Sequence, residues 1–458
     1  MYFKKAAQVT LILSVVTLFN KTVPILGVKL DVLFLLLSAG LLLVAYLKKE
    51  VSIDWPSTLL FFVLLSGIIL STVLGSLLSL HIYGSIPLDQ ILTQYQILIG
   101  CFIIFFEILI LGMGDNNFVK WLLYAFMFSL IAIITPYIPI DALQQVIGTT
   151  QHRFYGFIGD ANYYPTFMMV PTILLFYFLA KELQNRKSVL KAFFIFILFA
   201  ITIALTYWSG SRSGWLGVIA ELLIFSFFAA RANNRKVLRF FVLIIISITA
   251  LATGYLLLPT NAKSDIKLRV GYITTPTKVE VLDSVSGVHS ETISRGENSV
   301  KTIPIIDALS YNQDRLHIWL QGVRFLVKNP LGYGLVYYNI VNIVSAENHV
   351  SAHSFILETL LIGGPLLFFS LLYILGAVII RFISYKRINS DIDLETVVFS
   401  SLIGFLTSSF FLSSLLLRWF WIQLAILIIL QINRGAYSKL FNRRKKLILD
   451  KSSQPLEK

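Results

Sequence analysis

The stretch LKAFFIFILFAITIALTYWSGSRSGWLGVIAELLIFSFFAA (190–230) decides the fold class. Two apolar runs flank the short polar segment SGSRSG, which occupies 209–214. A helix needs about 20 mostly apolar residues to cross roughly 30 Å of hydrocarbon, and each run is close to that length. The stretch therefore predicts two consecutive transmembrane helices whose connection places Arg212 at the membrane surface.

The rest of the chain repeats this pattern. Of its 458 residues, 57% are hydrophobic and only 14% are charged, and the mean hydropathy is +0.79. That composition excludes an ordinary soluble domain, and the continuous runs exclude the short alternating segments of an outer-membrane barrel. The sequence predicts an all-α, polytopic membrane helical bundle of about 12 transmembrane helices, at 6–26, 30–47, 57–80, 90–112, 118–138, 161–180, 190–208, 213–230, 237–258, 353–380, 394–413 and 416–433.

The net charge of +14 indicates membrane orientation rather than nucleic-acid binding. With the N-terminus in the cytoplasm, 24 of the 38 Lys and Arg residues fall in segments on the inner side, including the tail motif NRRKK (442–446). Cytoplasmic loops carry this excess of positive charge, and long translocated loops are exempt from the rule. We therefore predict a multi-pass membrane protein with both termini in the cytoplasm, membrane lipid as a partner and no nucleic acid. The single cysteine, Cys101, lies in an apolar run and leaves no disulfide framework.

The predicted spans divide the chain into four parts. Residues 1–258 hold helices one to nine, 259–352 form one long extracytoplasmic loop, 353–433 hold helices ten to twelve, and 434–458 form a basic cytoplasmic tail. The first apolar run is interpreted as a transmembrane helix rather than a signal peptide, because it lacks a small-residue cleavage site and many spans follow it.

The long loop has two halves of different character. Its first half is polar and β-branched, which is typical of a small hairpin or a mobile loop. In its second half Leu316, Leu320, Val323 and Val327 share one stripe at helical spacing, and Pro330 ends the pattern. We expect an amphipathic helix that lies over the outer mouth of the bundle.

Arg212 is the first candidate for chemistry. Its neighbours are small, with Ser211, Ser213 and the glycines at 210 and 214, so a ligand can approach the backbone closely. The start of the following helix directs N–H groups and the positive end of its dipole outward, and an arginine beside it suits phosphate. A helix cap with one solvated arginine is the alternative that these residues allow equally.

Further candidates lie on the same predicted face. The loop before span six supplies Arg153 and Asn162, and the external helix supplies Arg315, with Trp319 one turn further along. The arginines together predict a cradle for a diphosphate at the lipid surface. Arg418 lies beside two tryptophans, which favours an interfacial anchor instead.

His349 and His353 stand where the long loop re-enters the membrane. A histidine at this boundary is suited to act as a neutral base near pH 7, and Glu358, about a turn inside the next span, indicates a functional or paired carboxylate. Metal binding by these three residues is the alternative, but no HExxH motif or cysteine partner supports a metal site. Asp391 and Asp393 are interpreted as part of a solvated loop, and the lack of a P-loop motif disfavours ATP-driven transport.

Four patches of the sequence together resemble the O-antigen ligase and polysaccharide polymerase family of bacterial inner membranes. They follow the family's order: an Arg–Gly–Asp/Asn entry to a span, a Ser-Arg-Ser-Gly motif, an Arg-x-x-x-Trp helix ending in Pro and Gly-x-Gly, and a His-Asn/Ser motif followed by glycine. In this chain they read RFYGFIGDANYYP (153–165), SGSRSGWLG (209–217), DRLHIWLQGVRFLVKNPLGYG (314–334) and AHSFILETLLIGG (352–364).

The resemblance implies a metal-independent glycosyltransferase that uses an undecaprenyl-diphosphate-linked glycan as donor and needs no cofactor. By analogy, Arg212 and Arg315 would hold the diphosphate, and His353 would orient or deprotonate the acceptor hydroxyl. The substrate site would further include Arg153, Asn162, Ser211, Ser213, Trp319, His349 and Glu358. A flippase and a chain-length regulator are the partner proteins that such an enzyme implies.

The leading interpretation is a polymerase that joins lipid-linked repeat units into surface polysaccharide on the outer face of the membrane. A ligase that transfers the glycan to another acceptor would use the same chemistry. A polysaccharide or lipid transporter or flippase is the alternative from another class. It predicts charged residues along a path through the bundle, whereas the arginines here gather on one predicted face.

Overall fold

The computed structural model describes most of the helical part of the chain. The described ranges are 2–17, 24–25, 28–52, 88–128, 148–150, 153–156, 160–185, 188–231, 236–258, 322–336, 354–388, 391–412 and 414–434, with short pieces at 66–67, 69–70, 73–74, 77, 260, 262–264, 266, 279–280, 302–303 and 319–320. Structural statements below refer to these residues.

The chain is a helical, polytopic membrane protein, as predicted. Seven of the described helices are long and apolar enough to cross a membrane. The count of about twelve stays a prediction, because most of the expected span 57–80 lies outside the described residues. The helices are α1 (Tyr2–Thr17), α2 (Leu30–Leu47), α4 (Leu88–Gly112), α5 (Asn116–Met127), α8 (Tyr164–Asn185), α9 (Val189–Trp208), α10 (Arg212–Arg231), α11 (Lys236–Leu256), α15 (Phe355–Ile388) and α16 (Leu394–Ser409), followed by a last helix over 418–434.

Three short antiparallel strand pairs lie in the connections. They are β1 (Pro24–Ile25) with β2 (Val28–Lys29), β3 (Gly148–Thr150) with β4 (Arg153–Gly156), and β5 (Val279–Glu280) with β6 (Thr302–Ile303). The last pair falls in the first half of the long loop, where the sequence predicted a hairpin as one alternative. A short 3-10 helix, η3 (Gly334–Val336), follows the external helix.

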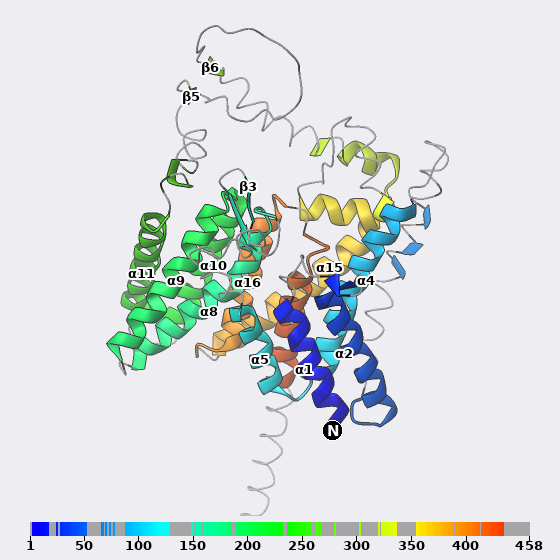
Figure 1. Ribbon diagram of the computed structural model, residues 1–458, viewed down its shortest axis with the longest axis horizontal. Coiled ribbons are helices and arrows are strands. Elements are labelled where there is room, and N and C mark those ends of the chain that lie inside the picture. Colours follow the sequence, from blue (N-terminus) through cyan, green and yellow to red (C-terminus); the bar gives the residue numbers. More distant parts are fainter. Residues whose placement is uncertain are drawn as a thin grey trace, which may run out of the picture.

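The bundle has two groups of helices on either side of a shared centre (Figure 1). On one side α8, α9, α10 and α11 pack against each other, and on the other α1 packs against α2, α4 and α5. Helix α16 contacts both α8 and α10. The two groups meet where α5 contacts α8.

The last helix, 418–434, is deeply buried in the bundle. Phe420, Trp421 and Ile422 are completely inaccessible to solvent. Trp421 packs edge-on against Phe102 of α4, at 5.0 Å between ring centroids, while Phe420 stacks on Phe405 of α16 at 5.2 Å. Aromatic pairs of this kind add about 0.5–1.5 kcal/mol each beyond the burial of their surface.

Arg418, at the start of this helix, is not the interfacial anchor that the sequence favoured. Its guanidinium forms an ion pair with Asp31 at the start of α2, and both side chains are largely buried. The same guanidinium lies against the backbone of Gly100. An acidic partner 387 residues away along the chain explains why the local sequence could not indicate this role.

Helix α10 approaches its neighbours with almost no side chain between the backbones. A Cβ atom added to Gly214 would lie 2.3 Å from the Cβ of Pro165 in α8. A Cβ on Gly217 would lie 2.7 Å from the carbonyl oxygen of Gly404 in α16. Small residues permit such close packing in membranes, where association depends on van der Waals contact rather than on the hydrophobic effect.

Helix α15 is not the continuous span that the sequence predicted over 353–380. It breaks at Gly364, whose φ of 59° is outside the helical range, and Pro365 follows. The carbonyl of Leu331 would lie 2.6 Å from a Cβ on Gly364, so only glycine fits there. The backbone N–H of Tyr333 donates to the carbonyl of Leu361 at 2.6 Å, which ties the external segment to the break.

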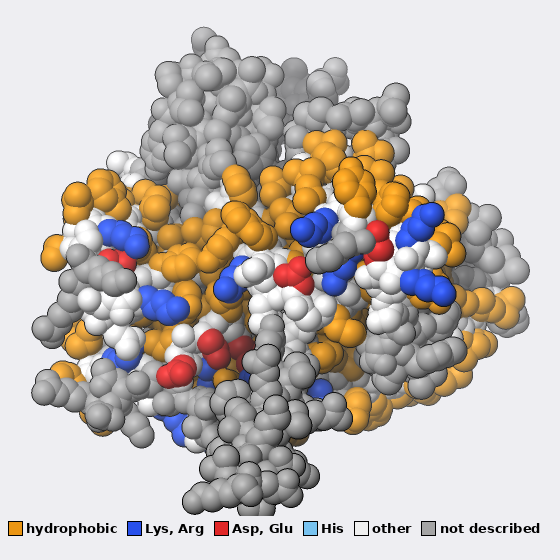
Figure 2. Space-filling model, turned by 90° about the horizontal axis from the view of Figure 1, so that it is seen from below, with side chains coloured by type: hydrophobic (Ala, Val, Ile, Leu, Met, Phe, Trp, Pro, Cys, Tyr) orange, Lys and Arg blue, Asp and Glu red, His pale blue; other side chains and the backbone are white. Residues whose placement is uncertain are grey.

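One end of the bundle carries a concentration of charged side chains. Figure 2 looks onto this end, where Lys and Arg side chains alternate with a few acidic ones inside a rim of apolar side chains. The basic residues at the corresponding helix ends include Lys120, Lys181, Arg231 and Lys386. These positions belong to the segments that the positive-inside rule assigns to the cytoplasm, and the orientation itself stays a prediction.

The close contact of α10 with α16 predicts that two glycine-to-alanine substitutions will have different effects on the stability of the protein. Gly217→Ala is expected to destabilise the protein by about 1–3 kcal/mol, because the new methyl group overlaps the backbone of α16. Gly376→Ala in α15, where nothing lies within 4 Å of the added Cβ, is expected to be neutral or to stabilise by up to about 1 kcal/mol. Thermal unfolding in detergent measures both changes. A Gly217→Ala protein as stable as the Gly376→Ala protein would contradict the packing.

Candidate functional site

The turn between α9 and α10 positions Arg212. Ser209 ends α9, and Gly210 follows with a φ of +66°, a left-handed conformation that favours glycine. The reversal leaves Ser211 directly before Arg212, the first residue of α10. Arg212 is half-buried and takes part in interactions, so it is not simply a solvated arginine.

Hydrogen bonds from serine side chains stabilise this turn. The Ser211 hydroxyl accepts from the backbone N–H of Gly214 at 3.3 Å and therefore caps the start of α10. The hydroxyls of Ser211 and Ser213 lie 3.2 Å apart, and both residues are buried. The Ser209 hydroxyl donates to the carbonyl of Thr206 at 2.6 Å. The interpretation of this stretch as a helix cap is therefore correct. The cap gives Arg212 a fixed position on the turn.

The entry to α8 lies against this turn. The Ser211 hydroxyl faces the backbone carbonyl of Asn162 at 3.5 Å. Asn162 is itself held by its backbone N–H, which donates to the Asp160 carboxylate at 2.7 Å. Pro165 also lies against Gly214, so the entry to α8 packs directly on this turn. Two of the four sequence patches are thus adjacent in space, as their shared face predicted.

The strand that carries Arg153 also packs here. Phe154, the next residue, is completely buried, with ring centroids 5.0 Å from Tyr164 and 5.3 Å from Trp208. Strand β4 therefore lies across the ends of α8 and α9, and this places the backbone of Arg153 beside the turn. The side chain of Arg153 lies outside the described residues.

Glu358 reaches the same end of the bundle from α15. It is only 1% exposed, and one of its carboxylate oxygens accepts from the backbone N–H of Leu415 at 3.1 Å. The carboxylate is therefore hydrogen-bonded within the protein, and its role in a substrate site stays a prediction. The contact fixes the start of α15 to the segment that leads into the last helix.

Tyr163 is a neighbour of this site that the sequence did not single out. Burial raises the pKa of its phenol, and the negative charges of Glu358 and Asp160 raise it further. The hydroxyl therefore stays protonated at any physiological pH and remains a hydrogen-bond donor. The pair Tyr163-Tyr164 directly before Pro165 is a signal for it, because aromatic hydroxyls at the start of a span lie at the membrane boundary.

The external helix packs on the start of α15. Helical residues are described at 319–320 and over 322–328, and the helix ends before Asn329, as predicted. Gly322 contacts Leu357, and Trp319 lies parallel to Phe411, with ring centroids 6.5 Å apart. The helix therefore covers the start of α15 and the residues that follow α16.

The apolar stripe of this helix faces away from the bundle. Leu320, Val323 and Val327 are 51%, 51% and 76% exposed. The side that touches the protein is instead formed around Gly322 and Phe325. The predicted stripe is thus present at the described positions, and Leu316 lies outside them.

Three predicted site residues, Arg315, His349 and His353, lie outside the described part of the chain. Their places relative to Arg212 stay predictions. Within the part that is described, no group of three His, Cys, Asp or Glu side chains is arranged to hold a metal ion.

The arrangement suits an anionic ligand at the membrane surface. A half-buried arginine begins a 20-residue helix, so its charge adds to the positive end of the helix dipole. The Ser211 and Ser213 hydroxyls and the backbone carbonyl of Asn162 supply uncharged polar groups on the same turn. An arginine, a helix N-terminus and neutral donors together are the groups that bind phosphate oxygens.

Comparison with known families gives one match to this region. Residues 197–372 match the family model for O-antigen ligase. The matched stretch begins in α9, contains Arg212, Arg315, Trp319, His349, His353 and Glu358, and ends in α15. No curated protein and no solved structure matches the chain. The match supports the resemblance seen in the sequence, and residues 197–372 are similar to the O-antigen ligase family.

Proposed function

We propose that this protein is a membrane glycosyltransferase that polymerises oligosaccharide repeat units linked to undecaprenyl diphosphate. The reaction takes place on the outer face of the bacterial cytoplasmic membrane and produces a surface polysaccharide. The observation that carries the proposal is the position of Arg212, which begins α10 within the stretch that matches the O-antigen ligase family.

In the proposed reaction, the hydroxyl oxygen of an acceptor sugar attacks the anomeric carbon of the donor glycan. The bond between that carbon and the diphosphate oxygen breaks, and undecaprenyl diphosphate leaves with the electron pair. His353 takes the proton of the acceptor hydroxyl. Arg212 and Arg315, joined by Arg153, offset the negative charge that grows on the diphosphate as the bond breaks.

The neighbouring residues have positioning roles in this proposal. Asn162 and Trp319 contact the glycan or the diphosphate, and Ser211 and Ser213 fix the turn. Glu358 holds the start of α15, which directly follows His353. The external helix covers the site and limits water, which competes with the sugar hydroxyl as acceptor. The chemistry needs neither a metal ion nor a cofactor.

The charge distribution supports the proposed orientation. Basic residues gather at the end of the bundle shown in Figure 2, and the Arg212 turn lies at the opposite ends of α9 and α10. The positive-inside rule then places both termini and the basic tail in the cytoplasm and the Arg212 turn outside. A flippase that delivers the lipid-linked repeat and a chain-length regulator are the expected partner proteins.

A ligase is the second candidate, because the matched family model describes an O-antigen ligase. It uses the same donor and the same arginines and differs only in its acceptor. A transporter of the lipid-linked glycan is the candidate from another class, and it would leave the bond between sugar and diphosphate intact.

A direct assay separates these functions. Purified protein is incubated with a lipid-linked repeat unit in the presence of EDTA, and the products are resolved on a gel. A ladder of longer lipid-linked chains is expected for a polymerase that needs no metal. Consumption of the donor only after a separate acceptor is added would identify a ligase, and an intact donor under all conditions would support the transporter.

Arg212→Ala is expected to lower the rate of polymer formation by roughly 100-fold or more, because one preorganised charge at the leaving group is lost. Arg231→Ala is the matched control, since Arg231 lies at the other end of the same helix. The single-turnover rate and the amount of inserted protein are measured for both variants. Normal polymer formation by a well-inserted Arg212→Ala protein would contradict the diphosphate role.

His353→Ala is expected to lower the rate by about 100- to 10,000-fold, the range for loss of a general base. With His353 present, the rate should fall as the pH drops below roughly 6.5, because a protonated imidazole cannot accept the proton. His289→Ala in the long loop controls for the loss of a histidine. If the His353→Ala protein keeps both the rate and this pH profile, the base assignment is wrong.

A further inference from the structure

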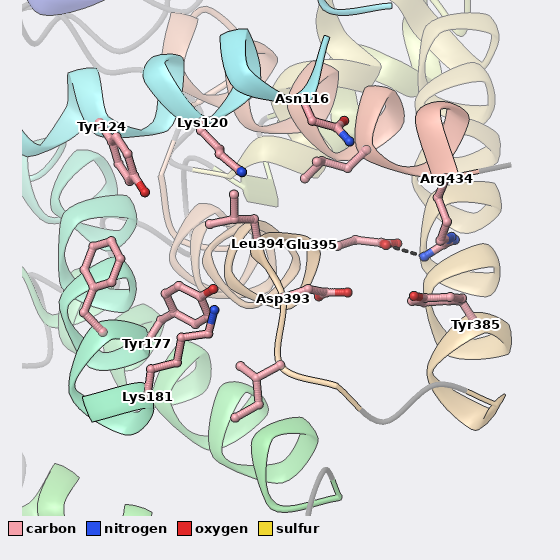
Figure 3. Close-up of a pocket in the computed structure, with 13 residues that line it drawn as sticks. Asn116, Lys120, Tyr124, Tyr177, Lys181, Tyr385, Asp393, Leu394, Glu395 and Arg434 are labelled. Atoms are coloured by element: carbon pink, nitrogen blue, oxygen red, sulfur yellow. Dashed lines mark hydrogen bonds and ion pairs between the residues drawn. The ribbon is translucent and has the colours of Figure 1, made fainter. Parts of the chain in front are cut away.

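A cavity of about 590 Å³ lies at the end of the bundle opposite the Arg212 turn. Its walls come from α5, the end of α8, the end of α15, the start of α16 and the end of the last helix (Figure 3). The volume is in the range of ligand sites for small molecules and headgroups. None of the residues that line the cavity falls within the matched stretch 197–372. The proposed reaction uses none of them either, so the cavity is separate from both.

The acidic side chains of the cavity are already paired. Asp393, which the sequence assigned to a solvated loop, caps α16 through the backbone N–H of Thr396 at 2.9 Å and forms an ion pair with Lys386 at 2.9 Å. Glu395 forms an ion pair with Arg434. These contacts offset both negative charges within the protein.

Two lysines of the cavity have no such partner. Among the described residues, no carboxylate lies within ion-pair distance of the amino group of Lys120 or Lys181. The amino group of Lys181 lies over the ring of Tyr177, 4.6 Å from its centroid. Lys120 extends from α5 toward the start of α16, on the opposite wall (Figure 3). Two positive charges therefore remain to attract an anion into the cavity.

The remaining walls fit the rest of a phospholipid headgroup. Tyr124, Tyr177 and Tyr385 border the cavity, and phenol hydroxyls donate to phosphate and glycerol oxygens. Apolar side chains surround this end of the bundle (Figure 2), so acyl chains attached to a bound headgroup would continue along an apolar surface. Basic pockets between transmembrane helices on the cytoplasmic side are known to bind anionic headgroups.

We propose that this cavity binds the phosphate headgroup of an anionic phospholipid from the adjacent leaflet, with Lys120 and Lys181 as the phosphate ligands. On the predicted orientation this is the cytoplasmic leaflet. The site is separate from the glycosyltransferase reaction, and it holds α5, α8 and α16 together from the end opposite the Arg212 turn.

The test uses the purified full-length chain in an uncharged detergent. Short-chain phosphatidylglycerol, phosphatidylcholine and inorganic phosphate are titrated separately, and the thermal unfolding midpoint reports binding. Phosphatidylglycerol is expected to raise the midpoint and phosphatidylcholine to leave it unchanged. In Lys120→Ala/Lys181→Ala the apparent Kd for phosphatidylglycerol should rise roughly five-fold for each lysine, about 25-fold for the pair.

Lys5→Ala/Lys48→Ala is the matched control, because it removes the same charge from two exposed lysines at the ends of α1 and α2. It should bind phosphatidylglycerol as the unchanged protein does. Single Lys120→Gln and Lys181→Gln proteins, each expected to lose about five-fold, replace the double variant if that protein does not fold.

The outcomes separate the sources of the phosphate. A midpoint that rises with inorganic phosphate as strongly as with phosphatidylglycerol, and only when both lysines are present, would support the phosphate site and identify a soluble ligand. Equal responses of the double variant and the control, or equal binding of phosphatidylcholine and phosphatidylglycerol, would overturn the proposal.

Discussion

The close approach of α10 to α8 and α16 is the constraint on which the site depends. Gly214 lets α10 meet Pro165 at the entry of α8, and Gly217 meets Gly404 of α16 backbone to backbone. Any larger residue would separate the helices and move the turn that holds Arg212 away from Asn162. In a membrane the hydrophobic effect does not bring helices together, so contact between small residues has to supply the attraction.

Polar contacts between side chains and backbone hold the rest of the bundle together within the membrane. Arg418 pairs with Asp31 across the centre, and Glu358 accepts from the backbone of Leu415. An unpaired polar group costs several kcal/mol in hydrocarbon, so each of these pairs fixes the register of the helices that it joins. The last helix and the segment before it thereby connect α2 and α15, although they carry none of the predicted catalytic residues.

The sequence predicts what depends on hydrophobic runs and fails where distant segments meet. The bounds of α2 match the expected span 30–47, because apolar length alone sets them. The break at Gly364 was not predicted, since its cause is the carbonyl of Leu331 in another segment. The predicted role of Arg418 as an interfacial anchor was wrong for the same reason, because its partner Asp31 lies in a distant segment. The alternation of spans across the membrane assigned Arg212 and Asn162 to one face, and the contact of Ser211 with Asn162 agrees with that assignment.

The two ends of the bundle use positive charge in different ways. At the end shown in Figure 2, basic residues are numerous, and Lys386 and Arg434 are paired with acidic side chains. These two paired charges follow from topology and need no ligand. At the other end an arginine is disfavoured by the positive-inside rule, yet Arg212 occupies a turn that three serines and a left-handed glycine fix in place. A charge that orientation does not require, held on a preorganised backbone, supports the proposed role of Arg212 in binding an anionic group.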